Sequence, residues 1–308
     1  MHEVTRRGEI ASSPAYDRRS DGFTRAPLVD AALHMTLDLC SLDPGGGIDS
    51  HLHSFEESVF VLGGRPVLQL EERSIRLDPG SGGIVPVGVS HGWVADGEEP
   101  AAWIEMTSPR RRAADEPPDT FFVGTALPEP PVPLNIRDPR NRHLFRFDDG
   151  QLDVERSRTQ GTSVDDAAVS ASIPTALLAY SGIGVKMLVD QRLGAQLHTM
   201  FVVEYQPGGV AHPHDHPFEE AYYMLEGEIE AVADGAEYTL EQGDTLWTGV
   251  GCIHGFVNTS GRRVRWIETT APQPPSGHSY RFNRDWDYLA AQLDGAGLER
   301  PLARREAS

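Results

Sequence analysis

The sequence predicts an all-β protein in which two barrels follow each other, joined by a proline-rich connector and followed by a short C-terminal helix. Short apolar or alternating runs, punctuated by Gly, Pro and Asp, recur along the chain, as they do in β-sandwiches and barrels. The sequence lacks the alternation of strands and helices that would indicate a parallel sheet. The chain also contains one module twice, and its 308 residues suffice for two domains with separate cores.

The repeat is clearest in two histidine-rich stretches, GGGIDSHLHSFEESVFVLGG at 45–64 and GGVAHPHDHPFEEAYYMLEG at 208–227. The two stretches begin 163 positions apart, and the same offset persists downstream, where His91 meets His254. An offset that holds across loops as well as strands indicates two copies of one domain rather than a chance likeness.

The elements of each copy follow from its local pattern. In the first copy the predicted strands are HMTLDLCSL (34–42), SVFVLGG (58–64), PVLQLEE (66–72), SIRLD (74–78) and AAWIEM (101–106), and the tripeptide WIE of the last returns at 266–268. Pro-rich, charged stretches predict an extended connector, and NRDWDYLAAQL has the apolar spacing of a helix. The predicted units are a first barrel domain at 22–112, a connector at 113–175, a second barrel domain at 176–282, and a helix and tail at 283–308.

Composition narrows the classes of partner. The chain carries 27 basic and 46 acidic side chains, a formal charge of -19, which disfavours nucleic acid and anionic membranes. Its polar start and the lack of a long apolar run predict a cytoplasmic protein without a membrane segment. With Cys40 and Cys252 alone, neither a disulfide framework nor a Cys-based zinc site is expected. The expected partners are a small-molecule substrate and a second copy of the chain, paired through sheet edges in a homodimer.

The repeated histidines and glutamates predict metal binding. Residues two apart share a face of a strand, so each His-x-His pair points one way, and a Glu of the same parity begins the next strand. A further His comes from a later strand, expected across the barrel. Each of these histidines alone is an ordinary core or surface residue, but the same spacing occurs twice in stretches that otherwise differ. Three imidazoles and one carboxylate suit Fe(II), Mn(II), Ni(II), Co(II), Zn(II) or Cu(II). Glu56 and Glu219 have the opposite parity and are expected to be solvated or paired across strands.

These motifs resemble the two conserved motifs of the cupins. The first motif, with its opening Gly, HxH pair, Glu and closing Gly, is complete in both copies. The second departs from the family pattern only outside the ligand positions, with Ala95 for the usual Asn in the first copy and Gly249 for the usual Pro in the second. The resemblance implies a bicupin, two tandem jelly-roll (double-stranded β-helix) barrels in one chain. It implies one metal per domain, held by His51, His53, Glu57 and His91 and by His214, His216, Glu220 and His254.

Parity also predicts what surrounds each metal. Around the first, the inward positions are Val59, Val61, Val89 and Trp93; around the second, they are Tyr222, Met224, Cys252 and Phe256. The surroundings of the metal in the first domain are therefore expected to be wholly apolar, whereas those in the second domain offer a phenol, a thioether and a thiol. This favours the second domain as the reactive site, with Tyr222 as a catalytic group, although aromatic side chains also simply fill barrels. His212 shares the ligands' parity and is a second candidate for proton handling, or else an exposed residue of a turn.

The resemblance implies an enzyme, and the function expected first is an oxygen-dependent oxidoreductase of dioxygenase type. Fe(II) or Mn(II) in each domain would take a small oxygen-rich or aromatic metabolite as a chelating substrate. Gentisate-type bicupins match less well, because their sites usually lack the Glu present here. The alternative is a redox-neutral hydrolase, decarboxylase or isomerase, in which the metal acts as a Lewis acid. Ureidoglycine aminohydrolase is a bicupin of this layout, although its first domain is usually metal-free. A third hypothesis is a protein that binds or senses a small ligand.

Overall fold

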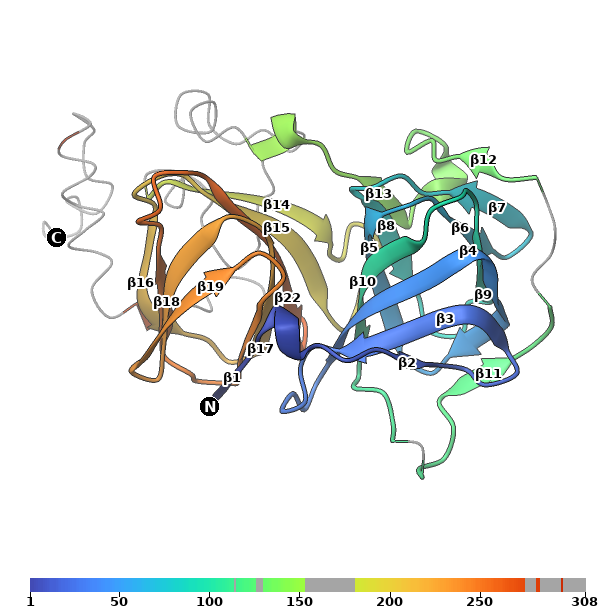
Figure 1. The fold of residues 1–308 in the computed structure, drawn as a ribbon, viewed down its shortest axis with the longest axis horizontal. Helices are drawn as coiled ribbons and strands as arrows, with labels where there is room; N and C mark the ends of the chain where they lie inside the picture. The colour runs from blue at the N-terminus through green and yellow to red at the C-terminus, as the bar shows by residue number, and fades with distance from the viewer. Residues whose placement is uncertain (114, 126–129, 153–180, 275–280, 283–294, 296–308) are drawn as a thin grey trace, which may run out of the picture.

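Two β-barrels lie side by side in the computed structural model (Figure 1). The structure describes residues 1–308 except 114, 126–129, 153–180, 275–280, 283–294 and 296–308. The all-β, two-barrel prediction is confirmed, whereas the predicted C-terminal helix lies outside the described residues. Among the residues that are described, no helix is long and apolar enough to cross a bilayer.

The first barrel is one curled sheet of twelve strands. The strands are β2 (Ser13–Pro14), β3 (Ser20–Pro27), β4 (Thr36–His53), β5 (Glu56–Gly63), β6 (Pro66–Leu70), β7 (Arg73–Arg76), β8 (Ser81–Val85), β9 (His91–Ala95), β10 (Ala101–Ser108), β11 (Thr120–Phe122), β12 (Val132–Pro133) and β13 (Leu144–Arg146). Their main order is β12-β7-β6-β9-β4-β10-β5-β8-β13, with β3 and β11 also paired to β4 and with β2 paired to β3. Three of these strands, β11, β12 and β13, come from the segment predicted to be an extended connector.

The second barrel consists of two sheets. Its strands are β14 (Ile183–Val189), β15 (Thr199–Tyr205), β16 (Val210–Asp215), β17 (Glu219–Glu226), β18 (Glu228–Ala233), β19 (Ala236–Glu241), β20 (Thr245–Thr248), β21 (His254–Val257), β22 (Val264–Ala271) and β23 (Arg281–Phe282). One sheet has the order β1-β20-β17-β22-β15-β14 and the other β19-β18-β21-β16-β23, where β1 is His2–Thr5 from the start of the chain.

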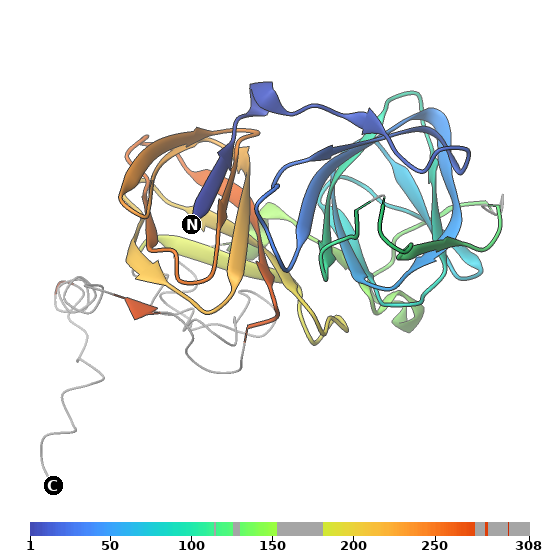
Figure 2. The same ribbon diagram turned by 90° about the horizontal axis from the view of Figure 1, so that it is seen from below.

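The two barrels exchange edge strands. The N-terminal β1 crosses to the second barrel and pairs with β20, as the blue strand of Figure 2 shows. In return, β13, which precedes the second barrel in the chain, pairs with β8 of the first. At the turn after β1, Arg6 Nη1 donates to Asp244 Oδ2 at 2.6 Å and the Arg7 backbone N–H donates to Asp244 Oδ1 at 2.9 Å. Thus β1, which precedes the first barrel in the chain, completes an edge of the second barrel. In the same way β13, which precedes the second barrel, completes an edge of the first.

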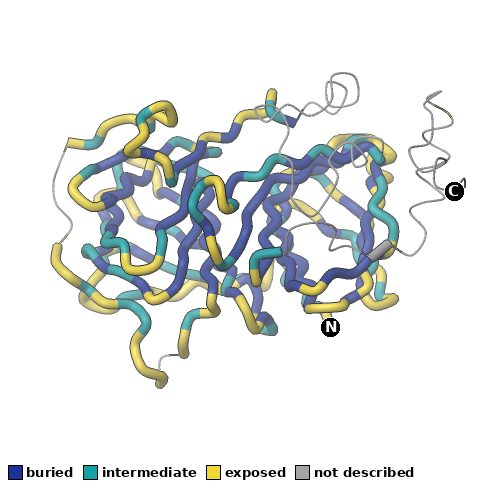
Figure 3. The backbone as a smooth tube through the Cα atoms, turned by 180° about the vertical axis from the view of Figure 1, so that it is seen from behind, coloured by how far each residue is buried: buried dark blue, intermediate teal, exposed yellow. Residues whose placement is uncertain are grey.

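Three hydrophobic cores explain why the strands read as apolar runs. One core fills each barrel, and the third lies between the barrels, where Leu37 and Ile104 of the first meet Met200 and Ile267 of the second. The strands of this interface are buried on both faces, which Figure 3 shows as dark blue tube between the two barrels. A strand covered on both faces favours continuous apolar sequence over strict alternation.

Two buried glutamates join the barrels reciprocally. Glu56 accepts hydrogen bonds from the backbone N–H groups of Gln196 and Leu197, and Glu219 accepts from those of Leu33 and His34. Their side chains are buried, so the expectation that they are solvated is wrong. Their parity points them away from the metal ligands as expected, but that face meets the other barrel instead of water.

Candidate metal centres

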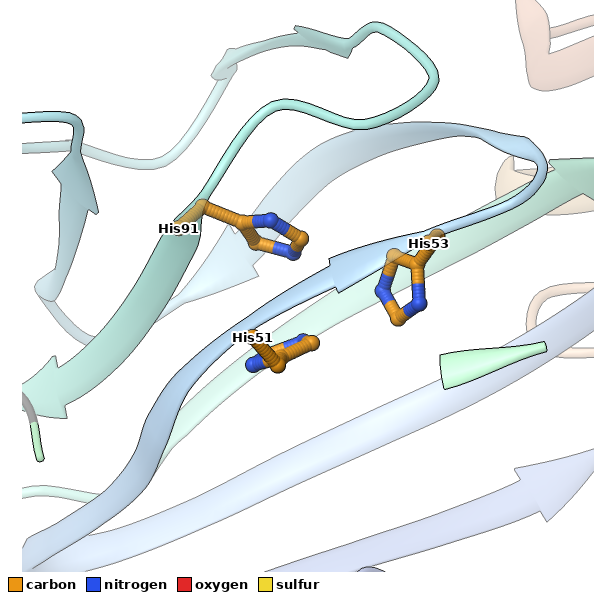
Figure 4. A group of neighbouring side chains, drawn as sticks. All are labelled: His51, His53 and His91. Atoms are coloured by element: carbon orange, nitrogen blue, oxygen red, sulfur yellow. The ribbon is translucent and has the colours of Figure 1, made fainter. Parts of the chain in front are cut away.

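In the first domain, four predicted ligands converge inside the barrel. β4 supplies His51 and His53, β5 supplies Glu57, and β9 supplies His91. His53 Nε2 lies 3.0 Å from Glu57 Oε2, and His91 Nε2 lies 3.6 Å from Glu57 Oε1. Figure 4 shows the three imidazoles turned toward a common point. His91 stands directly opposite His51 in the β4–β9 ladder, so the fourth ligand comes from the neighbouring strand and not from across the barrel.

The rings are oriented by their outer nitrogens. The Nδ1 atoms of His51, His91 and His53 lie at hydrogen-bond distance from Asp49 O (2.6 Å), Val89 O (3.2 Å) and Thr120 Oγ1 (3.1 Å). A neutral imidazole that donates through Nδ1 presents its lone pair at Nε2, which is how metal-binding histidines are usually held. The Nε2 atoms of His53 and His91 and Oε1 of Glu57 are buried and make no hydrogen bond to any described residue.

The charge states of this group suit a cation. Burial, helped by the neighbouring imidazoles of His91 and His53, lowers the pKa of His51 to about 3. Burial alone would raise the pKa of Glu57, but the contacts with His53 and His91 hold it well below its ordinary value. Burial also lowers the pKa of His53, whereas for His91 burial is outweighed by the contacts with Glu57, which raise it. The centre therefore offers three imidazoles and one carboxylate, and buried ligand atoms without hydrogen bonds to described residues fit a bound divalent transition metal.

The second domain repeats the arrangement with a wider spread. His216 Nε2 lies 2.8 Å from Glu220 Oε2, and His254 Nε2 lies 3.6 Å from the same oxygen. His214 stands opposite His254 in the β16–β21 ladder. The ring centroids of His214 and His216 are 6.3 Å apart, compared with 4.8 Å for His51 and His53. The carbonyls of His212, Phe218 and Cys252 lie 2.7, 2.7 and 3.0 Å from Nδ1 of His214, His216 and His254.

The cupin domain family matches the sequence twice, at residues 38–107 and 201–270. These ranges contain both sets of converging side chains. The protein is a bicupin.

Solved structures similar to the bicupin agree with this assignment of the fold. A substitution variant of salicylate 1,2-dioxygenase from Pseudoaminobacter salicylatoxidans, in complex with gentisate, superposes with a TM-score of 0.65 at 15% identity, covering 88% of this chain and 82% of that chain. AerE from Microcystis aeruginosa superposes with a TM-score of 0.55 at 14% identity, covering 85% and 96%. Identities this low show a shared fold only. A comparison with curated proteins found no match.

A tyrosine enters the second centre of the bicupin. The Tyr222 hydroxyl donates to Glu220 Oε2, and its oxygen lies 2.9 Å from His254 Nε2. The side chain is 1% exposed and packs on Phe256, with ring centroids 5.0 Å apart. Val59 occupies the corresponding position of the first domain, as the repeat predicts. Tyr222 thus both fills the barrel and reaches the ligand atoms.

The first centre has polar and aromatic neighbours that parity did not predict. The rings of Tyr16 and Phe122 lie 5.4 and 5.3 Å from that of His51. Arg25 stacks over Tyr16, with 4.9 Å from Cζ to the ring centroid, and Nη2 donates to the phenol oxygen at 3.2 Å. The expectation of wholly apolar surroundings is therefore wrong. It considered only strands of the repeat, whereas Tyr16 comes from the segment before it, Phe122 from the segment after it, and Arg25 from a strand without a sequence match.

Arg25 belongs to a charge network inside the first barrel. Arg25 Nη2 and Arg111 Nη1 each donate to Glu105 Oε1 at 2.7 Å, and Arg111 also bonds to Asp38. The Nε–H of Arg25 is buried and makes no hydrogen bond to the described part of the chain. Although burial lowers the pKa of Arg25, the neighbouring Glu105 carboxylate raises it well above its ordinary value. The guanidinium is therefore charged, with one donor left over.

The equivalent acid of the second barrel is Glu268, the last residue of the repeated WIE. Trp266 Nε1 donates to Glu268 Oε2 at 2.9 Å. Burial and the nearby carboxylate of Glu220 raise the pKa of Glu268 well above its ordinary value. Where the first domain balances its buried acid with two arginines, the second favours a protonated one.

The other predicted pocket residues lie in the barrel cores. Met224, Cys252 and Phe256 are buried in the second core, and Trp93 stacks on Trp103 in the first, with centroids 5.0 Å apart. Burial and nearby Asp234 raise the pKa of Cys252 to about 12, so this thiol is protonated at neutral pH. Contact of these residues with a substrate stays a prediction.

His212 does not follow the regular alternation of its strand. The β16–β21 register shifts between Ala211 and His214, and this irregularity removes the parity argument that placed the His212 side chain with the ligands. Its backbone carbonyl orients His214, as described above. A proton-handling role for its imidazole stays a prediction.

Proposed function

We propose that this bicupin is a metal-dependent oxidoreductase of dioxygenase type, which uses Fe(II) or Mn(II) to react a small oxygen-rich or aromatic metabolite with dioxygen. The observation that carries the proposal is the convergence of buried ligand atoms in each domain: those of His51, His53 and His91 lie within 4.8 Å of one another, and so do those of His216, Glu220 and His254. The proposed ligands are His51, His53, Glu57 and His91 in the first domain and His214, His216, Glu220 and His254 in the second. A bound metal of this kind supplies Lewis acidity and redox chemistry with dioxygen.

The structural neighbours support the dioxygenase type. Several are structures of salicylate 1,2-dioxygenase, some of them with gentisate, and they share the two-domain fold along most of this chain. Fold alone does not fix chemistry, so this support is an analogy. It outweighs the redox-neutral alternative, because both domains here retain a complete set of metal-ligating side chains.

We place the substrate in the first domain, in contrast to the expectation from sequence. Tyr16 and Phe122 flank His51 and would exclude water from a planar substrate lying against the imidazole. Arg25, with its unused Nε–H, would attract a carboxylate or another oxyanion. These groups bind and orient, and the phenol of Tyr16 is the nearest candidate for holding a proton.

Metal analysis and oxygen uptake test the proposal together. Protein purified without oxygen and reconstituted with Fe(II) or Mn(II) should hold one ion per domain, and His51→Ala and His214→Ala should each lose the ion of their own domain. Oxygen consumption should follow the addition of one member of a panel of hydroxylated aromatic acids, β-diketones and keto acids. Turnover that continues under strict anaerobiosis, or oxygen uptake that survives His51→Ala and removal of its metal, would contradict the proposal.

A further inference from the structure

The phenol of Tyr222 occupies a place that the repeat leaves apolar in the first domain. Its oxygen touches two of the proposed ligands of the second centre, Glu220 and His254, and it is buried with them. In the first domain Val59 stands at this position and carries no polar atom. The two centres therefore share four donor side chains and differ by a fifth oxygen.

The nitrogen that this oxygen approaches is the one that faces a metal. Nδ1 of His254 lies 3.0 Å from the carbonyl of Cys252, whereas Nε2 lies 3.6 Å from Glu220 Oε2 and is therefore the nitrogen that a metal would meet. The Tyr222 oxygen lies 2.9 Å from that Nε2. It is thus on the metal side of the ring, within the group of donors and not behind it.

The spacing is that of two ligands of one ion. Donors bound at about 2.1 Å and at right angles to each other are separated by about 3 Å. The contact between Tyr222 and His254 has this length, and so does the 2.8 Å contact between His216 Nε2 and Glu220 Oε2. The hydroxyl therefore lies where a cis ligand of the same ion would lie.

We propose that the Tyr222 phenolate is a fifth protein ligand of the metal in the second domain. This proposal rests on the proposed metal binding. On coordination, the oxygen exchanges its proton, which is released to the solvent, for a bond to the ion. A six-coordinate ion then keeps one open position in the second domain and two in the first, where Val59 adds no ligand. A substrate that chelates through two oxygens fits the first centre and not the second.

Visible spectroscopy of the ferric protein tests the assignment without measuring turnover. Phenolate bound to Fe(III) gives a charge-transfer band in the visible range, which imidazole and carboxylate ligands do not. His51→Ala protein, in which only the second centre is intact, is loaded with Fe(II), assayed for iron and oxidised with ferricyanide. We expect a visible band in this variant and in the wild type. Resonance Raman excitation within the band should show the ring vibrations of a bound tyrosinate.

Tyr222→Phe in the same background is the decisive comparison, because it removes one oxygen and keeps the ring that packs on Phe256. We expect iron to stay bound and the band to disappear. Tyr16→Phe is the matched control for the tyrosine near the first centre and should leave the band unchanged. An iron-loaded second centre without a band, a band that survives Tyr222→Phe, or a second centre that takes up no iron overturns the assignment. Oxygen uptake that persists without a band would overturn this assignment while leaving the proposed function standing.

Discussion

The two barrels hold the same set of proposed metal ligands in the same register but distribute their other polar groups in opposite ways. Register places Val185 of β14 at the position of Arg25 of β3, since Val185 faces Val203 as Arg25 faces Cys40. The first barrel thus has an arginine on this strand and Val59 beside its Glu ligand, whereas the second has a valine and a tyrosine. The two copies therefore share their proposed metal ligands but carry their other polar side chains on different strands of the barrel.

The largest expected difference is in activity. If the first centre takes the substrate, His53→Ala should lower kcat/KM by more than about 100-fold, beyond the usual loss on removal of a partner that only orients a ligand. His216→Ala should lower it by less than about 10-fold, because its metal does not meet the substrate. Steady-state oxygen uptake measures both variants. Equal losses, or the reverse order, would contradict the placement of the substrate in the first domain.

The repeated WIE glutamates should differ most in stability. Glu105→Gln leaves Arg25 and Arg111 without their shared carboxylate and should cost about 3–5 kcal/mol, as expected for a broken buried ion pair. Glu268→Gln should cost under about 1 kcal/mol, because a carboxamide resembles the protonated carboxyl that the raised pKa favours. Denaturant unfolding of metal-stripped protein measures both changes.

The stability of the Glu268→Gln variant should depend on pH differently from that of the wild type. A carboxyl with a raised folded pKa contributes stability that is fully present below the unfolded pKa of Glu and is lost as pH rises towards the folded value. The free energy of unfolding of the variant should therefore rise relative to that of the wild type as pH increases above about 4.3, the unfolded pKa of Glu. A relative loss over that range would show that Glu268 is ionised in the folded protein.

The interface glutamates should behave alike. Glu56→Ala and Glu219→Ala each remove a buried carboxylate that accepts from backbone N–H groups of the other barrel, and each should cost about 1–3 kcal/mol. Glu56 also lies 3.5 Å from the buried His198, whose other nitrogen is 2.6 Å from Ser58 Oγ, so its loss should be the larger of the two. Chemical unfolding monitored by tryptophan fluorescence gives both values. A negligible change in the free energy of unfolding of either variant would contradict the inference that both glutamates stabilise the contact between the barrels.

The smallest expected effect on stability concerns the N-terminal segment, β1 and the turn after it. Asp244→Asn removes the ion pair with Arg6 and should cost about 1 kcal/mol, with Ser81→Ala at the equivalent position as control. Burial raises the pKa of Asp244, but bonds from Arg7 and Arg6 outweigh it and lower the value overall. The contribution is thus present above the unfolded pKa of Asp and is lost as pH falls through the folded value. The difference between wild type and variant should shrink as pH falls below about 3.9, the unfolded pKa of Asp, and should vanish below the folded value.

The sequence predicted the two barrels, and it singled out four candidate metal ligands in each, because spacing within a repeat fixes which side chains share a face. It could not predict what covers the opposite face. Glu56 and Glu219 point outward by parity, yet outward from one barrel is the interior of the pair. Tyr16 and Arg25 were not predicted near the first centre for a different reason. They come from chain segments without a recognisable counterpart in the other copy, so no comparison of the copies singled them out.

The exchange of β1 and β13 has a consequence for biosynthesis. Proteins emerge from the ribosome N-terminus first, and domains generally fold as they appear. The first barrel can close its edge as soon as β13 is made, but β1 must wait for β20, more than two hundred residues later. Until then, a strand with unpaired backbone groups stays exposed on the nascent chain. The charged side chains of Arg6 and Arg7, which follow this strand, would keep the unpaired segment solvated until Asp244, their hydrogen-bond acceptor, has been synthesised.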